Sequence, residues 1–400
     1  MENVSKRKTR KRRQSNREEN KDVDTDVDGV NCRERITYDV LRLMLEYFNI
    51  TDLTRAAMVC RSWNEAAEKE IHTRLKPQHF LLEPNTESKK ITDPKYVVDK
   101  LFIQPSVGMV FNGFHTRRQI WQPDCLCNYL PPQTDYITLT NSGTIYDEVE
   151  NKARGLSSIF FPEIPDVKIK YFHTTKLDYL KFDSTQNPKS SNKLARELCK
   201  ISPKEENIKC IIMFLGGMTR NIFATPDPDH VESVINSIVS YGTNTAKNKI
   251  AIWGGIARRV MVCSSSRDKR ICKKSVPIAG LSICGSGVST WSMVLNSRIK
   301  TKEQAEKELT ALRDAVKLQK HTIGFMFSCC ARGDSWYSEP NVEAKIFRKL
   351  FPNVPLIGSI GDGEFGVSTV RHEYSPDERI FHQYATIFLI VSYGSVRKVL

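Results

Sequence analysis

Two stretches of this chain follow the same order: an apolar run ending in small residues, an amphipathic helical segment, and a second apolar run ending in glycine. The first stretch spans 208–255 and the second, about 110 residues later, spans 322–363. Short apolar runs separated by helices are typical of parallel strands in α/β proteins. We therefore predict an α/β (α+β) body with parallel strand pairs and an internal duplication of a strand–helix–strand unit.

The segments of the two copies differ in detail. The helix of the first copy is predicted at 229–242, with Asp229 and Glu232 as a capping box, and that of the second at 341–351. Another helix is predicted at 301–319 from a Thr301–Gln304 capping box and an apolar stripe, and a late core strand at 384–394. A polar break at 183–193 predicts a surface loop, and 84–135 is rich in proline without a clear pattern.

Charge is concentrated at the start of the chain. The 400 residues have a net charge of +14, and residues 1–17 alone contribute +7. We predict that the tail 1–30, basic and then acidic with almost no apolar residues, is disordered. Outside the tail the chain is only mildly basic, so we expect no nucleic-acid partner. The run KRKTRKRR predicts nuclear localisation, and a solvated tail is the alternative. Its basic residues are Lys6, Arg7, Lys8, Arg10, Lys11, Arg12 and Arg13.

Several features indicate an intracellular protein. The charged start is followed by no apolar signal-peptide core, and no apolar run approaches the ~20 residues that cross a bilayer. The eleven cysteines are an odd number at irregular spacings, which favours reduced thiols. We expect a location in the cytoplasm and nucleus and no membrane partner.

Residues 36–75 predict a small module of three helices. Apolar residues from Ile36 to Phe48 recur at helical spacing, Thr51 is the expected N-cap of a second helix, and Ser62 with Glu65 is a capping box for a third. Three short helices bury too little surface to be stable alone. Such a module keeps an apolar face for a partner, or it packs internally as an ordinary subdomain.

This module resembles an F-box. DVLRLMLEYF is similar to the usual E-[IL]-L-x-x-I-L-x-x-L, and TDLTRAAMVCRSW is similar to D-L-x-x-x-x-x-V-C-[RK]-x-W, although Thr37 replaces the common proline. The resemblance implies docking onto the Skp-type adaptor of a cullin–RING ubiquitin ligase. The residues it implies for adaptor binding, by direct contact or by holding the shape, are Ile36, Leu41, Met44, Leu45, Phe48, Leu53, Val59 and Trp63.

The body resembles the FIST-type domains. HTIGFMFSCCARG…NVEAKIFRKLFPNVPLIGSIGDGEFG, at 321–366, is similar to the FIST C-terminal signature, and 156–173 with 208–255 is similar to the preceding FIST-type half. FIST domains are recognition or ligand-sensing modules rather than enzymes. The resulting domain prediction is a tail at 1–30, an F-box at 31–76, a FIST N-like region at 77–245 and a FIST C-like domain at 246–395.

A ligand or substrate surface is predicted at the ends of the second copy's strands, because loops there are common ligand sites in α/β folds. Arg332 lies close enough to Cys329 and Cys330 to favour a thiolate, although small residues buried at a strand end are the alternative. The predicted surface comprises Cys329, Cys330, Arg332, Asp334, Trp336, Tyr337, Asp362, Glu364 and Phe365. The alternative is a structured loop without a binding role.

Neither a metal nor a nucleotide cofactor is expected. Zinc requires four converging ligands, which Cys125-x-Cys127 and the adjacent Cys329–Cys330 do not supply from sequence spacing. Gly361, Gly363 and Gly366 have the GxGxxG spacing of dinucleotide-binding proteins, but no amphipathic helix follows them. We expect these glycines to provide positive φ in a tight strand-to-strand turn.

These observations together predict a non-catalytic substrate receptor of an SCF-type ubiquitin ligase. The F-box would bind the adaptor and through it the cullin and RING subunits, and the body would bind a target protein for degradation. A small-ligand sensor built on the FIST-like body is the alternative. A cysteine-dependent enzyme centred on Cys329 or Cys330 is a third hypothesis.

Overall fold

The computed structural model describes most of the chain, and everything below concerns that part. The described residues are 37–82, 94–113, 125–131, 133–151, 155–174, 207–216, 250–264, 271–370 and 379–394. The predictions that lie outside them concern the tail 1–30 with its basic run, Ile36, the polar break at 183–193 and the helix at 229–242.

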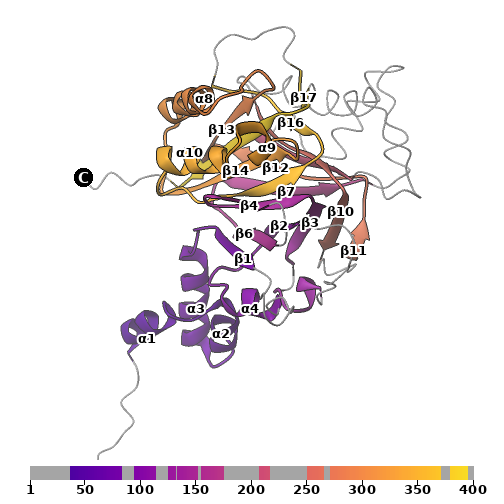
Figure 1. The fold of residues 1–400 in the computed structure, drawn as a ribbon. Coiled ribbons are helices and arrows are strands. Elements are labelled where there is room, and N and C mark those ends of the chain that lie inside the picture. Colours follow the sequence, from indigo (N-terminus) through magenta and orange to yellow (C-terminus); the bar gives the residue numbers. More distant parts are fainter. Residues whose placement is uncertain are drawn as a thin grey trace, which may run out of the picture.

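Three helices open the described chain and confirm the predicted helical module (Figure 1). They are α1 (Tyr38–Leu45), α2 (Ile50–Ala56) and α3 (Arg61–Thr73). Thr37, which replaces the common proline, accepts a hydrogen bond from the N–H of Val40 at 3.4 Å. It therefore satisfies one of the free amides that begin α1, which proline would not do.

Two predicted helix starts are wrong. Helix α2 is capped by Asn49, whose side chain accepts from the N–H of Asp52 at 2.9 Å, rather than by Thr51. Helix α3 begins one residue after Cys60, which makes no capping hydrogen bond, so Ser62 lies inside the helix. At α2 two neighbouring residues are able to cap and Asn49 does so, whereas α3 begins without any side-chain cap.

The body consists of three six-stranded sheets. The first has the order β1-β6-β2-β3-β10-β11, formed by β1 (Gln78–Leu82), β2 (Val107–Gly113), β3 (Asp135–Asn141), β6 (Gly155–Phe161), β10 (Arg259–Ser264) and β11 (Ile271–Ser275). The second has the order β17-β16-β9-β8-β12-β7, formed by β7 (Val167–His173), β8 (Ile208–Gly216), β9 (Ala251–Ala257), β12 (Ile278–Gly285), β16 (Glu364–Gly366) and β17 (Phe381–His382). The third has the order β13-β18-β14-β15-β4-β5, formed by β4 (Gly143–Tyr146), β5 (Val149–Asn151), β13 (Val288–Leu295), β14 (His321–Cys329), β15 (Leu356–Gly361) and β18 (Thr386–Tyr393).

All three sheets share one pairing pattern. Each contains a single parallel pair, β2–β3, β8–β9 or β14–β15, with two antiparallel strands on one side and an antiparallel hairpin on the other. The two parallel pairs predicted from sequence are therefore confirmed. The third copy is β2–β3: β2 lies in the proline-rich stretch 84–135 that had no clear pattern, and β3 follows directly after it. The repeat is therefore threefold rather than twofold.

The hairpin that follows each parallel pair joins a neighbouring sheet. Hairpin β4–β5 follows β3 but pairs with β15, β10–β11 follows β9 but pairs with β3, and β16–β17 follows β15 but pairs with β9. The three sheets are thereby linked in a closed cycle. The division at 245/246 stays a prediction, and each of the three sheets draws strands from both sides of it.

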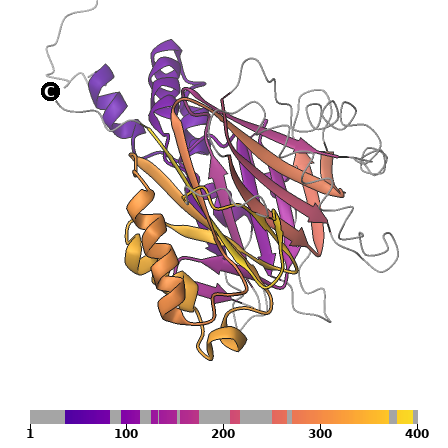
Figure 2. The same cartoon turned by 90° about the horizontal axis from the view of Figure 1, so that it is seen from above.

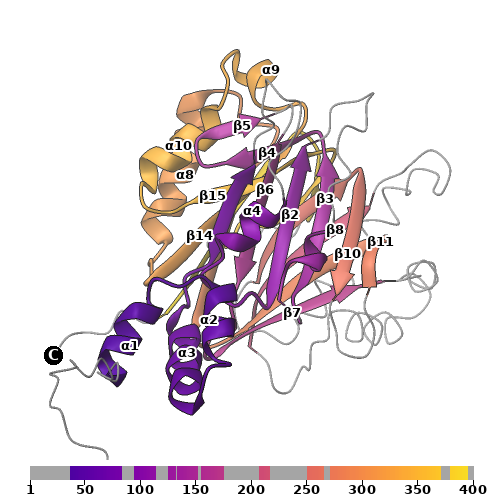
Figure 3. The same ribbon diagram turned by 90° about the horizontal axis from the view of Figure 1, so that it is seen from below.

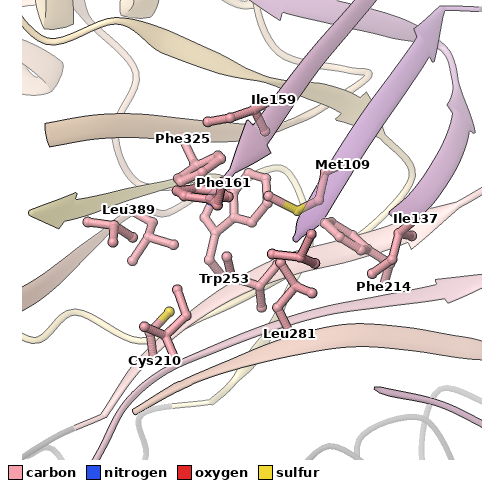
Figure 4. Packing of buried hydrophobic residues seen from close by; sticks show 14 of the residues in the cluster. Met109, Ile137, Ile159, Phe161, Cys210, Phe214, Trp253, Leu281, Phe325 and Leu389 are labelled. Atoms are coloured by element: carbon pink, nitrogen blue, oxygen red, sulfur yellow. The ribbon is translucent and has the colours of Figure 1, made fainter. Parts of the chain in front are cut away.

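One apolar core occupies the space between the sheets (Figure 4). Met109, Phe214 and Phe325 reach it from the first, second and third sheet, each fully buried. Trp253 lies among them, and its indole N–H donates to the carbonyl of Ile387 at 3.1 Å. That bond satisfies the polar atom of a fully buried aromatic ring and joins β9 to β18.

Helices cover the outer face of the third sheet. These are α8 (Lys302–Ala315) and α10 (Val342–Leu350), and the short α9 (Asp334–Tyr337) lies in the loop after β14 (Figure 1). The predicted Thr301–Gln304 capping box is confirmed, and Leu309 and Phe347 pack with Phe388 of the sheet. Seen from above, these orange helices and the indigo N-terminal helices lie on different sides of the strands (Figure 2). The short elements α4 (Pro94–Asp99) and η1 (Leu126–Asn128) precede β2 and β3.

The glycines of the GxGxxG run form a strand-to-strand connection without positive φ. Gly361 ends β15 and Gly366 ends β16, and neither these two nor Gly363 is among the residues with positive φ. The predicted reason is therefore wrong. A Cβ on Gly361 would lie 2.5 Å from the ring of Phe327, so close packing excludes a side chain here. No described helix is long and apolar enough to cross a membrane.

Candidate functional site

An apolar stripe runs along the exposed side of α1. Val40, Leu43 and Met44 are neighbours on one face of the helix, Tyr47 follows them in the turn after α1, and all four are exposed, Tyr47 to 82%. Met58 and Val59, in the turn between α2 and α3, are exposed to 75% and 63%. Six of the ten exposed large apolar residues in the described chain therefore lie between positions 40 and 59. Such a concentration marks an interaction surface.

The structure separates the predicted adaptor-binding residues into two groups. Leu41, Leu45 and Leu53 are buried in the helical core, so they hold the shape of the module. Phe48 and Trp63 are half-buried and pack against that core. Those on the surface are Met44 and Val59. Sequence reasoning did not assign Leu43 or Tyr47, although the i, i+3, i+4, i+7 spacing from Val40 carried the signal. It also missed Met58, which no local pattern singled out.

Arg74, just after α3, joins the helical module to the body. Its Nη1 donates to the carbonyls of Phe48 at 2.6 Å and Phe102 at 2.8 Å, and its Nη2 donates to that of Leu45 at 2.9 Å. The Nε donates to Glu70 at 2.7 Å. One guanidinium thus satisfies carbonyls at the end of α1 and in the segment between α4 and β2.

Further contacts make the connection rigid. The N–H of Ile50 donates to the carbonyl of Leu101 at 2.7 Å, and Ile50 is buried in the core formed by the first sheet and its neighbours. The hydroxyl of Tyr393, at the end of β18, donates to the carbonyl of Leu75 at 2.8 Å. The helices and the sheets are therefore held in one orientation.

A second group of predicted site residues lies where β14 and β15 end. Cys329 is the last residue of β14 and is buried, whereas Cys330 is exposed. A hydrogen bond from the Cys330 thiol, together with backbone N–H groups of Ala331 and Tyr384, lowers the pKa of Cys329 to about 6. The same interaction raises the pKa of Cys330. This arrangement favours the thiolate on Cys329, with Cys330 as its hydrogen-bond donor.

Glu364 is buried beside this thiolate. Its Oε2 accepts from the N–H of Ala385 at 3.1 Å, while its Oε1 is buried without a hydrogen bond of ordinary geometry. Burial, reinforced by the charge of Cys329, raises the pKa of the Glu364 carboxyl to about 10. A carboxyl of raised pKa next to a thiol of lowered pKa is the kind of pairing found at functional sites. Desolvation causes the shift of the carboxyl, whereas hydrogen bonds cause that of the thiol.

The remaining predicted surface residues lie at different depths. Arg332, Tyr337 and Phe365 are buried, so they support the site rather than line its surface. Asp334 and Asp362 are exposed, and Asp362 lies 3.9 Å from the guanidinium Nε of Arg258.

Trp336 belongs to an aromatic surface beside the thiols. It is half-buried, and its indole N–H donates to the carbonyl of Ile299 at 2.8 Å. Its ring lies nearly parallel to that of Tyr384, which is exposed to 51%, with centroids 6.3 Å apart. Tyr384 was missed because it is distant in sequence and belongs to no recognisable pattern. Cys330, Trp336, Tyr384 and Asp362 are the exposed or half-exposed groups of this site.

Four cysteines from two distant parts of the sequence also lie close together in the fold. The sulfur atoms of Cys125, Cys127, Cys263 and Cys272 all lie within 4.8 Å of one another. Sequence reasoning rejected Cys125-x-Cys127 because no second pair followed nearby. The second pair lies about 140 residues later, on β10 and β11, where only the sheet pairing brings it close.

Relatives of this chain were found among known proteins. No family model matches it. F-box only protein 22 of Pongo abelii is 26% identical over 396 residues, covering 89% of this chain and 93% of that protein. The Homo sapiens F-box only protein 22 is 26% identical over 280 residues, 67% of this chain and 64% of that protein. An F-box/LRR-repeat protein of Arabidopsis thaliana, At5g63520, is 31% identical over 126 residues, 29% of this chain and 24% of its own length.

Solved structures are similar only at a low level. A cyanuric acid hydrolase from A. caulinodans has a TM-score of 0.38 at 9% identity, and a second cyanuric acid hydrolase structure has 0.40 at 7%. Each comparison covers 80% of this chain and 99% of the other, and we infer no activity from scores this low. Because 89% of this chain aligns with F-box only protein 22 at 26% identity, the chain is a distant homologue of that protein.

Proposed function

We propose that this chain is the substrate-recognition subunit of an SCF-type cullin–RING ubiquitin ligase. Helices α1–α3 would bind a Skp-type adaptor and through it the cullin and RING subunits, while the sheets would bind a target protein. The observation that carries this proposal is the exposed apolar stripe on α1, in a module distantly homologous to an F-box protein. The chain itself would perform no bond chemistry.

Burial of the stripe supplies the affinity in this proposal. Fully burying a large apolar side chain contributes roughly 1.5–3 kcal/mol, and a few such residues dominate most interfaces. Leu43 and Tyr47 are the best anchors because they are exposed to 59% and 82% and lie one turn apart. An isolated module would leave these groups in water, which supports a partner at this face.

The rigid junction at Arg74 supports a receptor role. A receptor increases the effective concentration of a target lysine near the ubiquitin-charged partner, and this effect depends on a fixed span between the two binding surfaces. Arg74 and Ile50 fix the α-helical module on the body through hydrogen bonds of 2.8 Å to Phe102 and 2.7 Å to Leu101. The proposed target-binding region is the surface around Cys330, Trp336 and Asp362. Transport of the receptor between cytoplasm and nucleus would use the basic run at 6–13.

The proposal is tested by placing charges on the stripe. We expect Leu43→Asp with Tyr47→Asp to weaken binding to a purified Skp-type adaptor at least tenfold, which corresponds to about 1.4 kcal/mol. Leu41 and Leu45 are unsuitable because both are buried and their replacement would unfold the module. The measurement is the dissociation constant by calorimetry, with helical content followed by circular dichroism.

The matched control carries two changes on α3. Glu65→Asp with Lys69→Asp alters exposed polar positions on a different helix and should leave adaptor binding within about twofold. A folded Leu43→Asp, Tyr47→Asp double variant that binds the adaptor as tightly as the control would refute the proposed docking face.

A ligand sensor is the second candidate function, and the thiol–carboxyl pair of Cys329 and Glu364 favours it. A low-pKa thiol beside the rings of Trp336 and Tyr384 would suit a small electrophilic ligand. We expect a ligand of this class to raise the melting temperature of the full chain but not of a Cys329→Ser, Cys330→Ser variant. An equal shift in both proteins, or none in a screen of such compounds at saturation, would dismiss this site.

A further inference from the structure

The four-cysteine cluster lies at one edge of the first sheet. Cys125 and Cys127 flank the start of η1, just before β3, and Cys263 and Cys272 lie on β10 and β11. Figure 3 shows β10 and β11 at this edge, next to β3. Cys125 and Cys263 are buried, Cys127 is half-buried and Cys272 is exposed, so the cluster is closed toward the core and reaches the surface on one side.

The four sulfur atoms lie close enough together to surround a single ion, and a tetrahedral site would need them to move apart by a few tenths of an ångström to about 0.9 Å. Cys125 Sγ lies 3.4 Å from Cys263 Sγ and 2.9 Å from Cys127 Sγ, and Cys127 Sγ lies 3.5 Å from Cys272 Sγ. Zinc–thiolate bonds of about 2.3 Å in a tetrahedron place sulfur atoms about 3.8 Å apart. All four sulfurs fall within 4.8 Å of one another, which is too compact for two metal atoms to lie between them.

Donor groups surround the sulfurs as they do in metal–thiolate sites. The N–H of Lys273 donates to Cys263 Sγ at 3.2 Å. The hydroxyl of Tyr136 lies 3.0 Å from Cys125 Sγ and accepts from the N–H of Cys127 at 3.1 Å, which directs the hydroxyl proton toward Cys125. Such outer hydrogen bonds orient ligands and stabilise their charged form.

The backbone at the second pair adopts an uncommon conformation. Lys273 has φ +48°, in the left-handed region that costs a residue with a side chain roughly 1–2 kcal/mol. The β10–β11 register also shifts between Val262 and Ser264, at Cys263. Together these irregularities turn Cys263 and Cys272 toward the same point and aim the Lys273 N–H at a sulfur. An unfavourable backbone conformation such as that of Lys273 persists only when other interactions in the folded protein compensate for its cost.

Strand β11 has few side-chain contacts with the body. It is the edge strand of the sheet, and four of its five residues are exposed. Backbone pairing with β10 and the partial burial of Ile271 hold it. A cross-link from β10 and β11 to the segment before β3 would add to this attachment.

We propose that Cys125, Cys127, Cys263 and Cys272 bind one Zn²⁺ ion as a structural site. Four thiolates complete the tetrahedral coordination and leave no position for substrate, which distinguishes a structural from a catalytic zinc. The thiolates carry four negative charges against two on the ion, and the exposed Lys273 and Lys274 lie beside them. Binding would release the thiol protons and stabilise the folded state.

Metal content of the purified full chain tests the proposal. We expect about one zinc per chain in the wild-type protein and a loss to below ~0.2 in Cys272→Ser or Cys127→Ser. Cys330→Ser is the control, because its thiol is exposed and outside the cluster, and it should retain the ion. Cys272→His keeps a zinc ligand and should recover most of the metal.

A second measurement does not depend on variants that fold. Replacement of the ion by Co²⁺ in the wild-type chain should produce the visible absorption of a tetrahedral cobalt–thiolate site, and chelation should lower the melting temperature until zinc is restored. A reduced wild-type chain without zinc, bound iron in its place, a disulfide among the four cysteines by mass spectrometry, or full zinc content in both serine variants would each overturn the proposal.

Discussion

Arg332 donates a hydrogen bond from Nε to Oε1 of Glu343 at 3.0 Å, and both side chains are fully buried. The hydroxyl of Tyr337 donates to the same carboxylate oxygen at 2.6 Å. Arg332 lies in the loop after β14 and Glu343 in the first turn of α10, so the pair holds the loop of the thiol site against the helix that covers the third sheet.

Removing one partner of this pair should be costly. We expect Arg332→Met to lower the free energy of unfolding by about 3–5 kcal/mol, because it leaves a buried carboxylate without its counter-charge. The double variant Arg332→Met, Glu343→Leu should lose less than the sum of the single changes. Lys302→Met, which breaks an exposed ion pair with Glu339, should cost under about 1 kcal/mol. Urea unfolding measures these values, and a loss under 1 kcal/mol for Arg332→Met would contradict the prediction.

Glu364 should make the protein less stable as the pH rises. Because its pKa is raised from 4.5 in the unfolded chain to about 10 in the folded one, the folded state keeps a proton that the unfolded state releases. Stability from this group is complete below pH 4.5 and declines as the pH rises toward 10. Glu364→Gln, which keeps the acceptor for Ala385, should stabilise the protein at pH 7 by up to ~3 kcal/mol and flatten the pH dependence. A destabilised or unchanged variant at pH 7 would show that the carboxyl is ionised.

Cys329 should react as a thiolate near neutral pH. We expect its alkylation by a small electrophile to follow an apparent pKa near 6, measured by mass spectrometry of the 321–345 peptide. Cys330→Ala removes the donor thiol and should raise that pKa, whereas Cys330→Ser keeps a donor and should change it less. A wild-type midpoint at or above the ordinary thiol value would disprove the role assigned to Cys330.

Arg74 should control how firmly the helices are held. Arg74→Ala removes charged hydrogen bonds to Phe48, Phe102 and Leu45, and hydrogen bonds to charged groups contribute about 1.5–3 kcal/mol each before relaxation. We expect faster amide exchange in α1 and at Ile50, with β14 and β18 unchanged. Arg55→Ala, which removes an exposed arginine 3.5 Å from Asp52, is the control and should leave exchange unaltered. Uniformly faster exchange throughout the body would place Arg74 in a different role.

The local sequence pattern predicted individual helices and strands better than it predicted which strands pair with each other. The helical period at 36–75, the capping box at Thr301 and the parallel pairs around Met213 and Met326 all follow from residues near one another in sequence. Gly254 and Gly358 lie opposite these two methionines. At either position, any residue with a Cβ would clash with the backbone carbonyl of the facing methionine. The repeated glycine was visible in the sequence, but its meaning required the strand register.

How deeply a side chain is buried was harder to predict than which element or loop it belongs to. Arg332 and Glu364 are polar and follow a strand, so both were expected at the surface, yet each is fully buried. A charged residue enters the interior when a partner is available, as Glu343 is for Arg332, or when it becomes neutral, as Glu364 does. The partner comes from another element, so neither outcome is visible in the local pattern.

The sequence by itself determined the helices within 36–75, 301–319 and 341–351 and the parallel strands of the two predicted copies, because each has its own local apolar pattern. Only the tertiary structure decided that hairpins exchange among three sheets, and that Cys125 and Cys127 meet Cys263 and Cys272. The physical reason is that helical hydrogen bonds and side-chain periodicity are local, whereas a strand satisfies its backbone groups with any compatible edge. The choice of edge depends on the packing of the shared core around Trp253, to which distant parts of the chain contribute together.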